Sequence, residues 1–267
     1  MTVELAAIAI YPVKGCRRVE LASAQLAPSG LAGDRDWMVV RPDGRFLSQR
    51  THPALARVVA RLTPGGLALE APGLAPLALP AAGSPCEVEV WRDRMAALDA
   101  GEAAAAWLAR LLGEPARLVR RGPSTRRYAD RAWVGEQDVP VSFADAYPIL
   151  VCTTASLAVL NARLPAPVPM NRFRPNLVLE GLAPFAEDGI RRLRIGAAVL
   201  RLVKPCARCT VPAVDQDTGE PGIDPAPALK AFRYDRELRG VTFGVNALAD
   251  GPPGALLEVG MPVEVLD

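Results

Sequence analysis

The chain has 267 residues, of which 50% are hydrophobic and 22% are charged, and its formal net charge is +2 at neutral pH. This composition is typical of a globular protein with one large domain or two modest ones. The small net charge and the 5% aromatic content argue against a nucleic-acid-binding protein. No stretch approaches the ~20 apolar residues of a membrane span, and the N-terminus lacks the basic start and apolar run of a secretion signal.

The cysteine content favours a reducing compartment. The five cysteines form an odd-numbered set with a single close pair, Cys206 and Cys209, which is not the pattern of a secreted disulfide framework. We therefore expect a soluble, cytoplasmic protein that binds neither nucleic acid nor a membrane.

The first half of the chain predicts short, closely spaced strands. Apolar and alternating runs predict strands over residues 3–11 and 19–26, and a hairpin over residues 36–48 around the turn-forming residues 42–44. Residues 58–95 continue as short apolar pieces that proline and glycine interrupt. This spacing predicts a β-sandwich or a β-barrel.

Two segments predict helices instead. Residues 101–113 combine strong helix formers with a terminating glycine. Residues 154–164 space their apolar side chains helically, with Thr153 or Thr154 as the N-cap.

The basic, turn-rich segment between these helices predicts a domain boundary near residue 125. A first module then covers residues 1–125 and a second covers residues 126–267. In the second module, further strands are predicted over residues 175–180, 191–203, 239–244 and 255–266. The predicted fold class is mainly β (α+β), with two β-barrel modules and a few short helices.

The segment around the close cysteine pair is the most informative for function. Lys204 precedes Cys206 and Arg208 precedes Cys209, after a strand-like run over residues 198–203. A thiol acts as a nucleophile or a metal ligand only as the thiolate, and nearby positive charge favours that form. A soft thiolate suits a soft or redox-active metal.

Two common uses of such a pair are disfavoured. A structural zinc site needs four ligands, but the other cysteines are scattered and His52 is the only histidine in the sequence. A thioredoxin-type pair begins a helix, whereas β-branched residues and Pro212 follow Cys209. The spacing alone leaves open a pair of ordinary core cysteines in a strand.

Two polar segments are candidates for binding an anion or a heterocycle. Lys14 follows a strand and Arg35 precedes one, so both could face one anion, or they could be solvated surface cations. Residues 171–176 contain two arginines and two asparagines, which suit the polar edge of a heterocycle or a polar loop that enters a strand.

Two acidic segments have simpler interpretations. Residues 143–148, which contain Asp145, are interpreted as a turn before a strand at 149–152 rather than as the site of a catalytic carboxylate. Asp215 and Asp217 lack the remaining acidic positions of an EF-hand, so an Asx-type turn is expected there rather than a calcium loop.

Together, these motifs resemble the two-domain branch of the MOSC family, which is named for the C-terminal domain of molybdenum-cofactor sulfurases. The resemblance covers nearly the whole chain, and the order and spacing of the motifs are more specific than any one of them. The first-module motifs are residues 11–14 (Tyr-Pro-Val-Lys), 33–35 (Gly-Asp-Arg) and 46–50 (Phe-Leu-Ser-Gln-Arg). The second-module motifs are residues 172–176 (Arg-Phe-Arg-Pro-Asn), 205–209 (Pro-Cys-Ala-Arg-Cys), 215–219 (Asp-Gln-Asp-Thr-Gly) and 243–247 (Phe-Gly-Val-Asn-Ala).

This resemblance implies a function and a set of site residues. It implies a molybdenum-cofactor (molybdopterin) enzyme that reduces N-hydroxylated compounds such as amidoximes, hydroxylamines and N-hydroxylated bases. It implies that Cys209 is the catalytic cysteine and the metal ligand. The residues that it places around the cofactor are Lys14, Gly15, Arg35, Arg174, Asn176, Ala207, Arg208 and Asn246.

The resemblance also implies where this chain departs from its relatives. Some members have serine at positions 15 and 207, so Gly15 and Ala207 lack a hydroxyl that could hold the cofactor. Several bacterial members carry a ferredoxin-like domain with four clustered cysteines, which this sequence lacks. We therefore expect a separate electron-donor protein of the ferredoxin, flavoprotein or cytochrome b5 type. The alternative is a non-catalytic carrier of the cofactor or of persulfide sulfur on Cys209.

Overall fold

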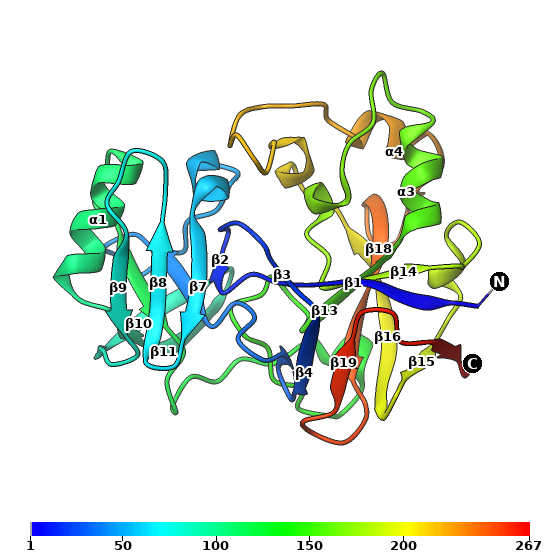
Figure 1. Ribbon diagram of the computed structural model, residues 1–267, viewed down its shortest axis with the longest axis horizontal. Helices are drawn as coiled ribbons and strands as arrows, with labels where there is room; N and C mark the ends of the chain where they lie inside the picture. Colours follow the sequence, from blue (N-terminus) through cyan, green and yellow to red (C-terminus); the bar gives the residue numbers. More distant parts are fainter. Residues whose placement is uncertain (1) are drawn as a thin grey trace.

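The computed structural model describes residues 2–267 and shows two lobes side by side (Figure 1). The first lobe is built from residues 13–16 and 37–120, and the second from residues 4–10, 19–31 and 131–265. The chain therefore begins in the second lobe and crosses to the first lobe and back twice. Backbone hydrogen bonds join residues 3–5 to residues 260–263, so the two ends of the chain lie together.

The second lobe contains a nine-stranded sheet whose main path runs in the order β20-β15-β16-β18-β13-β14-β1-β3, while β17 pairs with β18. Its pairs are antiparallel except β13 with β14. Its strands are β1 (Glu4–Ile10), β3 (Val19–Leu21), β13 (Ile149–Thr153), β14 (Leu177–Glu180), β15 (Arg192–Ile195), β16 (Ala198–Ala207), β17 (Tyr234–Asp235), β18 (Gly240–Ala249) and β20 (Val263–Val265). A three-stranded sheet completes this lobe, with β4 (Ser23–Ala27), β5 (Gly30–Leu31) and β19 (Leu256–Glu258).

The first lobe contains two smaller sheets. One has the order β10-β11-β12-β6-β2, and the other the order β7-β8-β9. Their strands are β2 (Val13–Lys14), β6 (Trp37–Val40), β7 (Val59–Thr63), β8 (Gly66–Glu70), β9 (Leu77–Pro80), β10 (Ser84–Val90), β11 (Asp93–Asp99) and β12 (Arg117–Arg120).

The helices are short. They are α1 (Glu102–Leu112), α2 (Arg131–Val134), α3 (Thr154–Asn161) and α4 (Ala226–Phe232), with 3-10 turns η1 (Pro53–Arg57), η2 (Met170–Phe173), η3 (Ala186–Asp188) and η4 (Val211–Ala213). Figure 1 shows α1 at the outer end of the first lobe and α3 and α4 close together on the second lobe. Gly113 ends α1 in the left-handed conformation, and the Thr153 side chain caps α3 by accepting from the Ser156 N–H. No helix within residues 2–267 is long and apolar enough to cross a membrane.

Each lobe has its own hydrophobic core. In the second lobe, β13 is buried at every position because β14 and β18 flank it inside the sheet. In the first lobe, Trp107 and Leu108 of α1 pack with β8 and with Leu118 of β12. The prediction of a mainly β protein with a few short helices is confirmed, although the four sheets are open in strand order.

The structure divides three of the predicted strands. The strand predicted over residues 191–203 becomes β15 and β16, and the one predicted over residues 255–266 becomes β19 and β20. The strand predicted over residues 19–26 is divided at Ala22, because β3 pairs with β1 whereas β4 pairs with β19. The hairpin predicted over residues 36–48 is present but short: Val40, the last residue of β6, forms an antiparallel bridge with Phe46, and the Leu47 N–H donates to the Val39 carbonyl. The division near residue 125 stays a prediction, and β1, β3, β4 and β5 precede it in sequence but pack in the second lobe.

A buried carboxyl group beside α3 predicts a pH dependence of stability. Glu187 is completely buried and accepts hydrogen bonds from the hydroxyls of Ser156 and Thr153, at 2.7 and 3.3 Å. Burial raises the pKa of Glu187 above its ordinary value of 4.5. The folded state therefore binds the proton more tightly than the unfolded state, so this contribution to stability is complete below pH 4.5 and is lost as the pH rises through the folded pKa.

Replacing this carboxyl group with an uncharged amide should remove that loss. At pH 7 we expect Glu187→Gln to be more stable than the wild type by about 1 to 2 kcal/mol. The difference should disappear near pH 4, where both side chains are neutral. Thermal unfolding of both proteins between pH 4 and pH 8 measures it, and parallel curves across this range would contradict the assignment.

Candidate functional site

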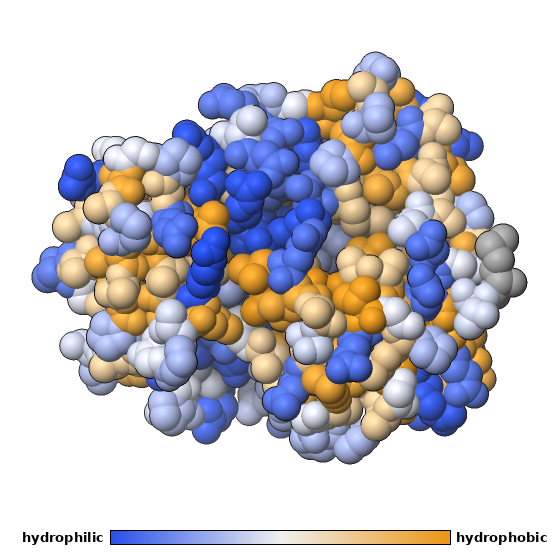
Figure 2. All heavy atoms as spheres, viewed as in Figure 1, coloured by the Kyte–Doolittle hydropathy of each residue, from blue (hydrophilic) through white to orange (hydrophobic). Residues whose placement is uncertain are grey.

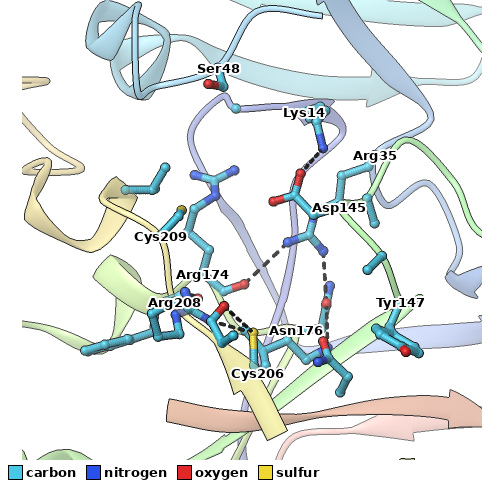
Figure 3. Close-up of a pocket in the computed structure, with 18 of the residues that line it drawn as sticks. Lys14, Arg35, Ser48, Asp145, Tyr147, Arg174, Asn176, Cys206, Arg208 and Cys209 are labelled. Atoms are coloured by element: carbon cyan, nitrogen blue, oxygen red, sulfur yellow. Dashed lines mark hydrogen bonds and ion pairs between the residues drawn. The ribbon is translucent and has the colours of Figure 1, made fainter. Parts of the chain in front are cut away.

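A cavity with a volume of about 260 Å³ receives side chains from both lobes. Figure 2 shows that hydrophilic residues gather where the two lobes meet in this view. The nine predicted site residues all line this cavity, from sequence positions as far apart as Lys14 and Asn246. Figure 3 shows how its polar residues converge. The roles of these residues in binding stay predictions.

The two cysteines of the close pair lie in different environments. Cys206 belongs to β16 and is partly buried, and its sulfur accepts a hydrogen bond of 3.0 Å from Nη1 of Arg208. Cys209 lies beyond the end of β16 and is exposed, although it lines the cavity. Irregularities in the pairing of β16 with β18 occur on either side of Lys204 and Pro205, and such bulges redirect side chains.

Two arginines of the cavity adopt an unusual backbone conformation. Arg35 has a φ of 50° and Arg174 a φ of 55°, and residues other than glycine rarely adopt positive φ values. Both guanidinium groups lie over the Tyr11 ring, at 4.2 and 4.1 Å from its centroid. Burial raises the pKa of Tyr11 to about 12, so its ring remains neutral between the two cations. Backbone strain of this kind gathers at functional sites.

Asn176 holds one of these arginines in place. Its Oδ1 accepts from Nη1 of Arg35 at 2.9 Å and from the Leu150 N–H at 3.1 Å, and its Nδ2 donates to the Ala9 carbonyl at 3.1 Å. Asp34 forms an ion pair with Arg35 and accepts from the Tyr11 N–H. Although Asn176 lines the cavity, its amide is engaged with protein groups and is positioned to orient Arg35.

Lys14 forms an ion pair that the sequence did not indicate. Its Nζ donates to Asp145 at 2.5 Å and to the Phe143 carbonyl at 2.8 Å, and only 7% of its side chain is exposed. Burial lowers the pKa of Lys14, although Asp145 opposes this effect. Desolvation in the cavity raises the pKa of Asp145, whereas its ion pair and hydrogen bond with Lys14 lower it. The lowering effects together are larger, so the pKa of Asp145 lies below its ordinary value. Asp145 is therefore an ionised acceptor at neutral pH, and the interpretation of residues 143–148 as a turn alone missed this partner.

A second connection between the lobes was also missed. Gln49 and Gln216 exchange amide hydrogen bonds of 3.0 and 2.8 Å, and Arg174 donates to the same Gln216 oxygen at 3.0 Å. The turn that carries Gln216 is the predicted Asx turn, because Asp215 accepts from the N–H groups of Asp217 and Thr218. Glutamine has no spacing signature, so only the folded chain reveals this pair.

Comparison with known proteins agrees with the motifs. A family described as the MOSC N-terminal beta barrel domain matches residues 2–115, and the MOSC domain matches residues 138–264. The predicted boundary near residue 125 falls between these ranges.

Full-length relatives show the same similarity. Mitochondrial amidoxime reducing component 2 of Rattus norvegicus is 35% identical to this chain, over 84% of this chain and 70% of its own length. Mitochondrial amidoxime-reducing component 1 of Homo sapiens is 33% identical, over 96% of this chain and 81% of its own length. Molybdenum cofactor sulfurase of Danio rerio is 32% identical over 88% of this chain, which corresponds to 31% of the sulfurase. The chain therefore belongs to the MOSC family, with an N-terminal MOSC beta barrel domain followed by a MOSC domain.

Proposed function

We propose that this protein is a molybdenum-cofactor-dependent reductase of N-hydroxylated compounds. The observation that carries the proposal is an exposed thiol, Cys209, in a cavity that both lobes line with cations. The resemblance to the amidoxime-reducing components spans most of both chains and supports the same reaction. The substrate is then a small molecule, and the electrons come from a separate protein.

The residues of the cavity fit this cofactor in charge and in ligand chemistry. Cys209 offers the soft thiolate that a redox-active metal prefers. Lys14, Arg35, Arg174 and Arg208 offer N–H donors and positive charge to an anionic phosphate and a polar heterocycle. Within residues 2–267, Nε of Arg208 is buried without a hydrogen-bond partner, a feature that it shares with four arginines outside the cavity, and it is free to donate to a ligand.

The reaction removes one oxygen atom from nitrogen. Two electrons and two protons convert the N–OH group to N–H and water, and the bound cofactor supplies the two-electron redox chemistry. Lys14 donates two of its three N–H groups to Asp145 and Phe143, which leaves one for an anion in the cavity. The ionised Asp145 keeps that ammonium in place and is not itself the proton donor at neutral pH.

Two observations favour a reductase over a carrier of cofactor or persulfide sulfur. The chain matches most of each amidoxime-reducing relative but less than a third of the sulfurase. In addition, the cations of the cavity surround much more space than one persulfide sulfur occupies, which disfavours the persulfide carrier in particular.

The experiment measures metal and turnover together. We expect protein from a cofactor-competent host to contain molybdenum and to reduce benzamidoxime with reduced methyl viologen, but not with NADH alone. NADH-driven turnover would contradict the need for a separate donor protein. A persulfide mass shift on Cys209 without molybdenum would support the carrier, and neither metal nor turnover would contradict the reductase.

A further inference from the structure

Arg50 is a cation of the cavity with no assigned role. Its side chain lines the cavity, but within residues 2–267 it forms neither a hydrogen bond nor an ion pair. Its backbone belongs to a tight turn in which the Thr51 and His52 N–H groups both donate to the Ser48 carbonyl. A guanidinium group carries five N–H donors, and because none is committed to a protein acceptor among the described residues, this half-buried group is available to a ligand in the cavity.

Two aromatic side chains hold this guanidinium group. Its Cζ lies 4.6 Å from the Trp91 ring centroid and 5.8 Å from the Phe46 ring centroid. The two rings meet edge to face at 5.1 Å, so they form one support. Arginine stacks on aromatic rings through its flat face, which lysine cannot do. Because Trp91 supports the guanidinium group and the side chain also lines the cavity, Arg50 can offer a flat surface to a ligand.

Trp91 occupies a conformation that a bulky residue rarely adopts. It lies in the turn between β10 and β11 with a φ of 59°, and 48% of its surface is exposed. Arg35, Arg174 and Trp91 are three of the five non-glycine residues with positive φ among residues 2–267. Two of the three line the cavity, and the third supports a residue that lines it. The two-residue hairpin turn between β10 and β11 requires this backbone conformation, and it presents the exposed Trp91 ring to Arg50.

We propose that Arg50, supported by Trp91 and Phe46, is a specificity-determining residue that stacks on the planar ring of the substrate. This inference rests on the proposed reductase function. It predicts that Arg50 distinguishes substrates with an aromatic ring from those with a saturated chain, because a flat cation binds a π-face and a saturated chain offers none. Trp91 and Phe46 are positioning residues, since they act through Arg50.

A pair of substrates with the same reacting group isolates the ring. Benzamidoxime and acetamidoxime both carry the amidoxime group, and only the first carries an aromatic ring. Affinities of the cofactor-loaded protein for both are measured by isothermal titration calorimetry without a reductant. The KM and kcat for both are then measured with reduced methyl viologen.

We expect Arg50→Lys to raise the KM and the dissociation constant of benzamidoxime about fivefold, the size of one aromatic stacking contact, and to leave kcat and the acetamidoxime values unchanged. Trp91→Ala should have the same effect, whereas Trp91→Phe should retain most of the preference. The matched control is Arg45→Lys, because Arg45 is an exposed arginine that pairs with Asp43. Arg45→Lys should change neither the KM nor the dissociation constant of either substrate.

The outcomes separate this inference from the proposed function. If Arg50→Lys weakens the binding of both substrates equally, or if that variant loses molybdenum, the stacking role is overturned. If every variant reduces both substrates and the ratio of their KM values does not change, the reductase function is retained and the stacking role of Arg50 is contradicted. If the protein binds benzamidoxime more tightly than acetamidoxime, Arg50→Lys abolishes this difference and neither substrate is reduced, the stacking role is supported and the reductase function is contradicted.

Discussion

Cys209→Ala should purify as a folded protein that retains on the order of one-tenth or less of the wild-type molybdenum. Cys209 is exposed and lies beyond the end of β16, so its replacement leaves no cavity in a hydrophobic core. The unfolding temperature without cofactor should therefore match that of the wild type. The loss of metal follows because an alanine methyl group offers no ligand, whereas the surrounding arginines can contribute only charge and hydrogen bonds. Elemental analysis and thermal unfolding of the same samples measure both expectations.

The matched control is the other cysteine of the pair. Cys206 accepts a hydrogen bond from Arg208, but Arg208 also donates to the Phe173 carbonyl at 2.7 Å and so keeps one anchor. Cys206→Ala should therefore retain most of the molybdenum. If Cys206→Ala loses the metal and Cys209→Ala keeps it, the ligand has been assigned to the wrong sulfur.

Asn176→Ala should lower the free energy of unfolding by about 3 kcal/mol. The Asn176 side chain is almost fully buried and makes hydrogen bonds to three groups, on β1, on β13 and on Arg35. Alanine leaves these groups without their side-chain partner in a place that water enters with difficulty. For a chain of this length the unfolding temperature should fall by about 6 to 12 °C, which differential scanning calorimetry measures.

Asn246→Ala is the control for that experiment. Asn246 also lines the cavity, but its amide makes one hydrogen bond, at 3.2 Å to the Lys204 carbonyl, and is partly exposed. We expect a loss of less than about 1 kcal/mol. Similar losses in the two variants would show that the hydrogen bonds of Asn176 carry no special weight in joining β1, β13 and Arg35.

The two lobes are joined at the cavity by polar contacts across long sequence separations. Lys14 reaches Asp145, and Gln49 pairs with Gln216, so residues of one lobe complete the wall that the other begins. The Gln49–Gln216 pair and Arg174 share one amide oxygen, which couples the position of a cavity arginine to the contact between the lobes.

Local interactions made much of this architecture predictable. Helix α1 was expected from its helix formers and its terminal glycine, and α3 from its apolar spacing and its Thr153 cap, because these signals act within a few residues of each other. The Asx turn at Asp215 was predictable for the same reason. The nine predicted site residues could be named because their motifs resemble those of a family, although the partners of their side chains could not.

Tertiary packing decided the rest. No local pattern distinguishes β1 and β3 from other short strands, yet β1 pairs with β14 and β3 pairs with β1, which places both in the second lobe. Asp145 resembles any turn residue until folding brings it to Lys14, 131 residues away. From the sequence, Asn176 resembles a cofactor-binding residue, but in the fold its amide forms hydrogen bonds with Arg35, Leu150 and Ala9. The sequence thus determined the short-range elements and the types of chemical groups in the site, whereas partner choice depended on the fold, because buried polar groups bond to whatever the packing brings within reach.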